Sequence, residues 1–146
     1  MNIQSEQLSA VIPQTLRLLA RGISKELDQA SIPLTLSQFS MLDFLLTNSE
    51  AVQTDLANHL HKDKSVILRQ LDQLEKSGWV ERQLDPNDRR RKNLIVTKQG
   101  KEIHRKGAKY RSKVFAQALE GIDPAQVTIV LEVLENMARN IQSQDQ

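Results

Sequence analysis

The stretch that decides the fold is residues 53–97, QTDLANHLHKDKSVILRQLDQLEKSGWVERQLDPNDRRRKNLIVT. Its first half contains two short amphipathic helix patterns, which are separated by a polar turn at residues 61–63. In the second pattern Ile67, Leu71 and Leu74 fall on one stripe of a helix, because residues three and four positions apart share a face. This half of the stretch therefore predicts a helix-turn-helix.

The second half of the stretch has the pattern of a β-hairpin. After Gly78, a residue type that commonly ends a helix, residues 79–84 and 93–97 form two predicted strands. Asp85-Pro86-Asn87-Asp88 lies between them, and proline and Asx residues favour a turn there. The turn leads into Arg89-Arg90-Arg91-Lys92, so four cations are predicted at the tip. Two helices followed by a basic hairpin are typical of a winged helix-turn-helix.

These residues resemble the MarR family of bacterial transcription regulators. Members share a Leu-Glu-x-x-Gly helix end, an Asp-x-Arg wing and a closing Thr-x-x-Gly. These motifs are here Leu74-Glu75-Lys76-Ser77-Gly78, Asp88-Arg89-Arg90 and Thr97-Lys98-Gln99-Gly100. The resemblance covers nearly the whole chain. It departs at Val66 and Leu68, where recognition helices of the family often carry small hydroxyl residues, so contacts through those hydroxyls do not carry over.

Composition sets the class of protein. A chain of 146 residues suits one domain with a substantial core. It has no cysteine, which excludes disulfides, thiolate zinc sites and cysteine-based oxidant sensing, and which fits a cytoplasmic protein. No apolar run approaches the ~18 residues that span a bilayer, and the N-terminal residues lack the pattern of a secretory signal. We therefore expect a cytoplasmic protein with no membrane partner.

Charge is unevenly distributed along the chain. The net charge is only +2, but residues 61–113 contain 16 Lys and Arg against 7 Asp and Glu, a net of +9. The remaining residues have a net charge of −7. A basic middle between acidic ends indicates a nucleic-acid-binding face, with a merely solvated charged surface as the alternative.

The second helix of the helix-turn-helix is predicted to read DNA with its outward face. Arg69 suits guanine, Lys64 and Ser65 suit phosphates, and Val66 can meet thymine methyl groups. Leu68 can either do the same or lie at the edge of the core, Gln70 can point either way, and Asp63 can cap the helix. Lys62 and Lys92 are further candidates for phosphate contacts.

The hairpin tip is predicted to enter the minor groove through Arg90, where the potential is most negative over A·T tracts. The family resemblance implies that Asp88 holds this arginine in position. The alternative is a mobile cationic loop that only attracts phosphates. The full set of predicted DNA-binding residues is Lys64, Ser65, Val66, Arg69, Gln73, Asp88, Arg89 and Arg90.

The two ends of the chain are predicted to form dimerisation helices. Residues 8–27 and the helix after Asp123 are apolar over more of their circumference than one contact requires, which indicates a homodimer. Covering the core of one subunit is the alternative. We expect a single domain over residues 1–146, with dimerisation segments at 1–34 and 100–146 and a winged helix-turn-helix lobe at 35–99. Pro13 is expected to kink or restart its helix, and Gly107 to allow a local bend.

Other chemistry has little support. His59, His61 and His104 lack metal-ligand spacing, so no metal is expected, and the scattered glycines form no phosphate loop. We expect no cofactor and no enzymatic activity. The predicted function is that of a DNA-binding transcription regulator, most simply a repressor on a palindromic operator, and the resemblance implies release by a small aromatic effector. A transcription activator or a winged-helix protein-interaction module is the alternative.

Overall fold

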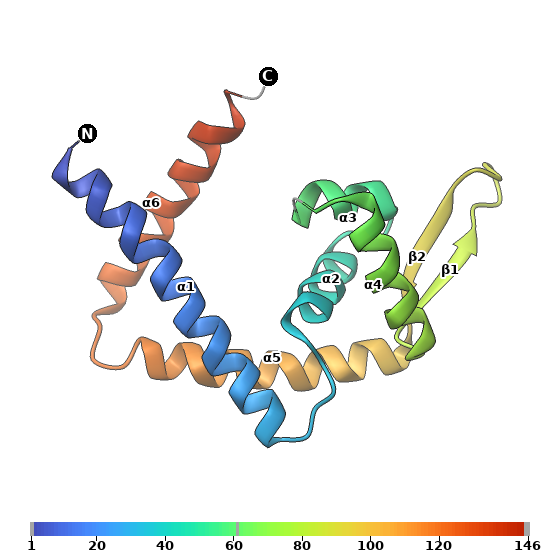
Figure 1. Cartoon of the computed structure of the whole chain (residues 1–146), viewed down its shortest axis with the longest axis horizontal. Coiled ribbons are helices and arrows are strands. Elements are labelled where there is room, and N and C mark those ends of the chain that lie inside the picture. Colours follow the sequence, from blue (N-terminus) through green and yellow to red (C-terminus); the bar gives the residue numbers. More distant parts are fainter. Residues whose placement is uncertain (1, 61, 145–146) are drawn as a thin grey trace. The chain divides into compact units, whose positions relative to one another are not determined.

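The computed structural model describes residues 2–60 and 62–144, and in this part the chain is mainly helical with one β-hairpin. The predicted fold class is thereby confirmed, while His61 of the predicted turn lies outside the described residues. The elements are α1 (Ile3–Gln29), α2 (Leu36–Thr47), α3 (Gln53–Leu60), α4 (Lys64–Lys76), β1 (Val80–Leu84), β2 (Lys92–Val96), α5 (Lys98–Ala118) and α6 (Pro124–Gln142) (Figure 1).

The chain divides into two compact units, Met1–Val114 and Phe115–Gln146. The second unit contains the end of α5 and the helix α6. Asp123 caps α6, because its Oδ1 accepts a hydrogen bond from the N–H of Ala125 at 2.9 Å, and Pro124 occupies the first turn. None of the residues Pro124–Gln142, all of which the structure describes, is buried.

The core of the first unit lies within the helix-turn-helix. Ile67, Leu71 and Leu74 of α4 are fully buried, as their spacing predicts, and they meet apolar side chains of α2, α3 and the hairpin. Each such side chain contributes about 1.5–3 kcal/mol through removal from water. The sequence Thr35-x-x-Gln38 has the pattern of a capping box, and α2 starts there, because Thr35 and Gln38 bond to each other's backbone N–H.

The helix α4 ends at Gly78, as predicted. Gly78 has φ +76°, a conformation that glycine adopts without steric cost. The N–H of Trp79 donates to the carbonyl of Leu74 at 3.0 Å, and the N–H of Gly78 donates to that of Glu75 at 2.9 Å. This pair of bonds is a Schellman motif, which satisfies the last carbonyls of the helix and turns the chain into β1.

Thr97 joins the end of α4 to the start of α5. Its hydroxyl donates to the carbonyl of Gly78 at 2.6 Å and accepts from the N–H of Gly100 at 3.0 Å. Its own N–H donates to the carbonyl of Trp79 at 3.0 Å. A Cβ on Gly100 would lie 2.1 Å from that same carbonyl oxygen, so only glycine fits. We call these four residues, Gly78, Trp79, Thr97 and Gly100, the wing junction.

The hairpin is antiparallel, with Val80 paired to Val96 and Leu84 to Lys92. Val80, Leu94 and Val96 are buried against the helices, so the base of the hairpin belongs to the core. The outer part extends beyond α3 and α4 (Figure 1).

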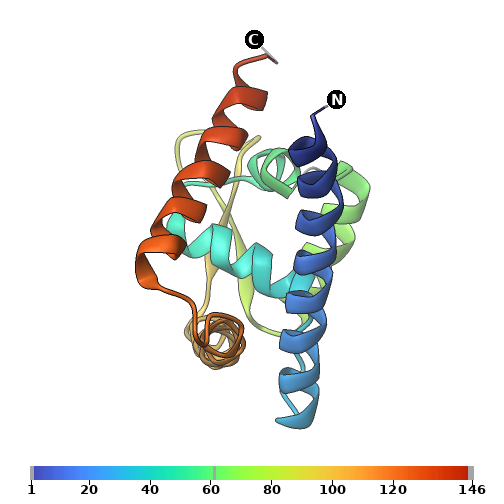
Figure 2. The same ribbon diagram turned by 90° about the vertical axis from the view of Figure 1, so that its left-hand side faces the viewer.

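A polar cluster joins α2 to α5. The two helices run in different directions, as Figure 2 shows in a view along α5. The two oxygens of the Asp43 carboxylate meet His104 Nε2 at 2.7 Å and Arg111 Nη1 at 2.8 Å. Partial burial of Asp43 by itself would raise the pKa of its carboxyl group. The hydrogen bonds and charges of His104 and Arg111 outweigh this effect, so the pKa lies below its usual value.

Two helices continue through residues at which the sequence suggested an interruption. The helix α1 continues through Pro13 without a restart, because Pro13 is exposed and water can reach the carbonyl that proline leaves unbonded. The helix α5 likewise continues through Gly107. This glycine permits close packing, since a Cβ there would lie 2.8 Å from Leu34 Cδ2.

We predict that Gly100→Ala lowers the free energy of unfolding by at least ~1–3 kcal/mol, because the added methyl group must displace the backbone carbonyl of Trp79. Urea denaturation measures this loss. Lys101→Ala, an exposed change in the same helical turn, serves as the control and should stay within about 0.5 kcal/mol. Equal stability of the Gly100→Ala variant and the wild type would contradict the close contact.

Candidate nucleic-acid interface

The outward face of α4 is open to solvent along its length. Val66 is half-buried, while Leu68 has an exposed fraction of 42% and is therefore not part of the core. The other residues predicted from this helix to contact DNA all have exposed side chains: Lys64, Ser65, Arg69 and Gln73. The buried stripe of Ile67, Leu71 and Leu74 is what directs this face outward.

The N-terminus of α4 differs from the prediction in one respect. Asp63 occupies the N-cap position, but its side chain makes no capping bond to the described residues. Its backbone carbonyl closes the first turn instead, accepting from the N–H groups of Val66 and Ile67 at 3.1 Å each. The predicted side-chain cap is therefore wrong. The dipole of the helix leaves this end favourable for a phosphate.

Gln70 and Lys62 both turn toward α2. Gln70 Nε2 donates to Ser37 Oγ at 2.8 Å, and Lys62 Nζ donates to the same oxygen at 2.9 Å. The open prediction for Gln70 is thereby decided, because its side chain faces the protein. These contacts join the middle of α4, and the turn before it, to the start of α2.

The tip of the wing is organised by its aspartates. Asp88 Oδ1 accepts from the backbone N–H of Arg90 at 2.9 Å, which is an Asx turn. Asp85 Oδ1 accepts from the N–H of Asn87 at 2.8 Å, and this bond is the main reason why the pKa of the Asp85 carboxyl lies below its usual value. Asp88 thus bonds to the backbone of Arg90, and the side chains of Arg89 and Arg90 are exposed.

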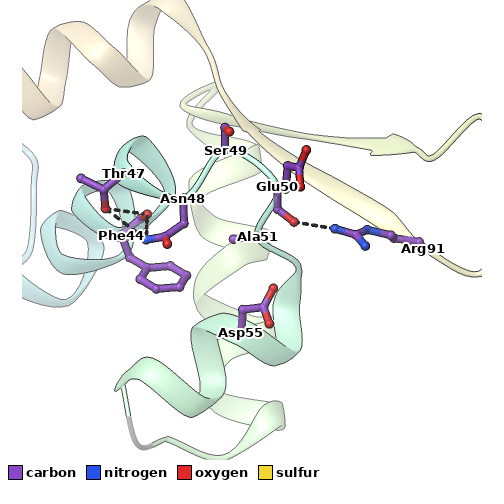
Figure 3. A pocket seen from close by; sticks show the side chains of 8 residues that line it. All are labelled: Phe44, Thr47, Asn48, Ser49, Glu50, Ala51, Asp55 and Arg91. Carbon is purple, nitrogen blue, oxygen red and sulfur yellow. Dashed lines mark hydrogen bonds between the residues drawn. The ribbon is translucent and has the colours of Figure 1, made fainter. Parts of the chain in front are cut away.

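Arg91, the third cation of the run, makes contacts within the protein. Its Nη2 donates to the backbone carbonyl of Glu50 at 2.6 Å, in the loop between α2 and α3 (Figure 3). Its Nε donates to Asn93 Oδ1 at 3.2 Å and lies 3.8 Å from Asp85 Oδ2. Arg91 therefore differs from the other cations of the run in having these partners, which the sequence did not predict. The partner carbonyl is 41 residues away in sequence, so no local sequence pattern predicts the contact.

Arg82 of β1 is a second cation with protein partners. Its Nη2 lies 2.6 Å from Asp72 and its Nε 3.5 Å from Glu75, both on α4. The strand β1 and the helix α4 are thereby joined along their sides as well as at the wing junction. Sequence reasoning missed this pair, because the strand and the helix meet only after folding.

The histidines have partners of other kinds. His104 bonds to Asp43, His59 stacks on the ring of Phe44 with centroids 4.4 Å apart, and His61 lies outside the described residues. Within residues 2–60 and 62–144, no three His, Cys, Asp or Glu side chains gather as metal ligands. Among the helices of the same residues, none is sufficiently long and apolar to cross a membrane.

A buried helix-turn-helix core, an exposed second helix and an antiparallel wing with exposed arginines define a winged helix-turn-helix protein. Residues 34–92 match the model of the MarR family. The protein YdgJ of Bacillus subtilis, an uncharacterised HTH-type transcriptional regulator, is 27% identical over 124 residues, which cover 83% of this chain and 76% of YdgJ.

Solved structures agree with this result. A MarR transcriptional regulator from Methanosarcina mazei has a TM-score of 0.83 at 25% identity, over 94% of this chain and 98% of that one. The transcriptional repressor CouR bound to a 23-mer DNA duplex has a TM-score of 0.81 at 25% identity, over 94% and 96%. CouR from Rhodococcus jostii bound to p-coumaroyl-CoA has a TM-score of 0.79 at 24% identity, over the same shares. The family model, the curated relative and the solved structures thus all support a MarR-family winged-helix transcriptional regulator.

We predict that Asp88→Ala weakens specific DNA binding several-fold more than Asp88→Asn does. Both changes remove the charge, but asparagine keeps an oxygen that can accept from the N–H of Arg90. Gel-shift titration of the two variants at one salt concentration measures the difference. Identical affinities would show that the turn at Asp88 does not position the tip.

Proposed function

We propose that the protein is a sequence-specific repressor that binds a palindromic operator in double-stranded DNA as a homodimer. The observation that carries the proposal is that two exposed surfaces suited to DNA lie on the proposed winged helix-turn-helix lobe, residues 35–99. The exposed face of α4 and the exposed tip arginines, Arg89 and Arg90, are joined through the wing junction and through Arg82. Such a lobe presents a helix to the major groove and a basic tip to a neighbouring minor groove.

In this proposal the exposed face of α4 and the tip of the wing contact different grooves of the DNA. Arg69 hydrogen-bonds to guanine in the major groove, and Gln73 and Val66 lie farther along the same groove. Lys64 and Ser65, beside the helix N-terminus, bind phosphates and set the register. Arg90 enters the minor groove, with Arg89 beside it and Asp88 shaping the turn. The DNA complex of the similar repressor CouR supports this kind of partner.

The homodimer is proposed to form through segments 1–34 and 100–146. In α1 the N-terminal half leaves large apolar side chains exposed, among them Leu8, Val11 and Leu16. In α6 the same holds for Val130, Leu134, Met137 and Ile141, which recur at helical spacing. Apolar faces of this extent are usually covered, and a second copy covers both helices by one symmetric operation.

Regulation by a small molecule completes the proposal. CouR has been solved with p-coumaroyl-CoA, which contains an aromatic group. We propose that a small aromatic effector releases this repressor from its operator in the cytoplasm. A change in operator affinity when such a compound is added to the purified protein would support this part.

The operator is expected to contain two inverted half-sites about one helical turn apart, roughly 10 base pairs, with A·T-rich flanks. The dimer places one α4 in each major groove, and narrow A·T-rich minor grooves favour an inserted arginine. Selection from random oligonucleotides tests this expectation. An asymmetric site, or half-sites on opposite faces of the duplex, would contradict binding by a symmetric homodimer. If no sequence is enriched, specific DNA binding itself is wrong.

The purified protein is expected to sediment as a dimer at micromolar concentration. Replacing two apolar residues of one α6 stripe, as in Val130→Glu with Leu134→Glu, should shift it to monomer, because the new charges would be buried between the subunits. Asn136→Glu adds a carboxylate elsewhere on the same helix and should leave the dimer intact. A wild-type monomer, or a dimer that persists in the double variant, would show that α6 is not the interface.

A further inference from the structure

We propose that Arg91 is a positioning residue for DNA binding, which ties the outer wing to the loop between α2 and α3 and so sets where Arg90 lies. This inference rests on the proposed function, because it assumes that Arg90 contacts DNA. The proposed role of Arg91 differs from that of Arg89 and Arg90, although all three belong to one basic run in the sequence.

The guanidinium of Arg91 connects groups from two parts of the fold. On one side, Nη2 donates to the carbonyl of Glu50 at 2.6 Å, in the α2–α3 loop. On the other side, Nε donates to Asn93 Oδ1 at 3.2 Å and faces the Asp85 carboxylate at 3.8 Å, both within the hairpin. Asn93 Nδ2 in turn donates to Asp85 Oδ2 at 3.4 Å. Arg91 thus links the α2–α3 loop to hairpin residues on both sides of the turn, Asp85 and Asn93.

The outer wing needs such a bridge. A two-stranded hairpin is marginally stable by itself in water. Apolar burial holds its base, through Val80, Leu94 and Val96, but none of residues 83–93, all of which the structure describes, is buried. Leu84, the last residue of β1, has an exposed fraction of 65%. The bond to Glu50 is therefore a contact with the helical core made from beyond the buried part of the hairpin.

The loop on the other side is a fixed anchor. Asn48 Nδ2 donates to the carbonyl of Phe44 at 2.9 Å, and the N–H of Ala51 donates to the carbonyl of Asn48 at 3.0 Å. Ala51 is buried, and the N–H of Val52 donates to Asp55 Oδ2 at 2.8 Å. Figure 3 shows the Glu50 carbonyl directed toward Arg91, and Phe44, Asn48, Ala51 and Asp55 line the same pocket. Fixing Arg91 to this loop therefore fixes it to α2 and α3.

The geometry requires arginine in particular. A guanidinium presents several N–H donors in a rigid planar fork, so it can meet the Glu50 carbonyl and the Asn93 amide at the same time. An ammonium group carries the same charge as a point on a flexible stem and cannot hold this planar arrangement. Arg91→Lys thus separates positioning from charge.

The experiment compares Arg91→Lys, Arg91→Ala and Lys92→Ala with the wild type, using fluorescence anisotropy on the selected operator at several salt concentrations. Both Arg91 variants should bind about tenfold more weakly, although the lysine variant keeps the charge. Their slopes of log affinity against log salt should match the wild type, because no phosphate contact is lost. Lys92→Ala removes a charge from the neighbouring residue and controls for general attraction. Wild-type affinity of Arg91→Lys, or a reduced salt slope for Arg91→Ala, would make Arg91 a phosphate contact and overturn the proposal.

A double-mutant cycle tests whether Arg91 acts through Arg90. If it does, Arg90→Ala combined with Arg91→Lys binds no more weakly than Arg90→Ala alone, whereas independent contacts would add. Additive losses would therefore overturn the proposal. Thermal melts of all variants verify folding.

Amide hydrogen exchange on the DNA-free protein tests the anchor without any assumption about DNA. The N–H of Asp85, which bonds to the carbonyl of Arg91 at 3.0 Å, should exchange faster in both Arg91 variants than in Lys92→Ala. Unchanged exchange would show that Arg91 does not hold the wing. Wild-type operator affinity of Arg90→Ala, by contrast, would refute the groove contact of the proposed function, and the exchange rates would then decide the anchor alone.

Discussion

The position of the wing depends on the hydroxyl group of Thr97. It donates to the carbonyl at the end of the α4 cap and accepts from the first turn of α5, and its backbone N–H bonds to Trp79. The end of the recognition helix, both strands and the start of α5 therefore meet at one point. Gly78 supplies the left-handed backbone there, and Gly100 allows the approach of a carbonyl that any Cβ would block. A displacement of this junction would move α4 and the wing together.

The structure assigns different roles to the cations of the basic segment. Arg82 pairs with α4, Arg91 bonds to the α2–α3 loop, and Arg111 pairs with Asp43 while it lies over the ring of Phe39. Arg69, Arg89 and Arg90 keep exposed side chains on the outer face of α4 and at the tip of the wing. The partnered arginines connect elements of the fold, although the side chain of Arg91 is itself 42% exposed. A regulator of this kind gains specificity when its readers are held at a constant separation.

Much of the fold follows from the sequence by itself. The period of Ile67, Leu71 and Leu74 identified the recognition helix and its exposed face, and the capping box at Thr35 identified the start of α2. The turn at Asp85–Asp88 and the helix end at Gly78 could also be predicted, because caps and turns depend on neighbours a few residues apart. The family resemblance agreed with these local patterns and with the matched model over residues 34–92.

Only the tertiary structure decided which polar side chains of the basic segment face the protein. Arg91 bonds to a carbonyl 41 residues away in sequence, and Gln70 to a hydroxyl 33 residues away. Hydrophobic periodicity cannot predict contacts between residues so far apart in sequence. Helix propensity likewise shows the cost of Gly107 but not its packing role, because Leu34 and Phe39 lie where a Cβ would be only in the folded chain. Local chemistry determined the elements, their ends and the outward face of α4. Which side chains hold those elements together was decided by contacts between residues distant in sequence, because such contacts exist only once the chain has folded.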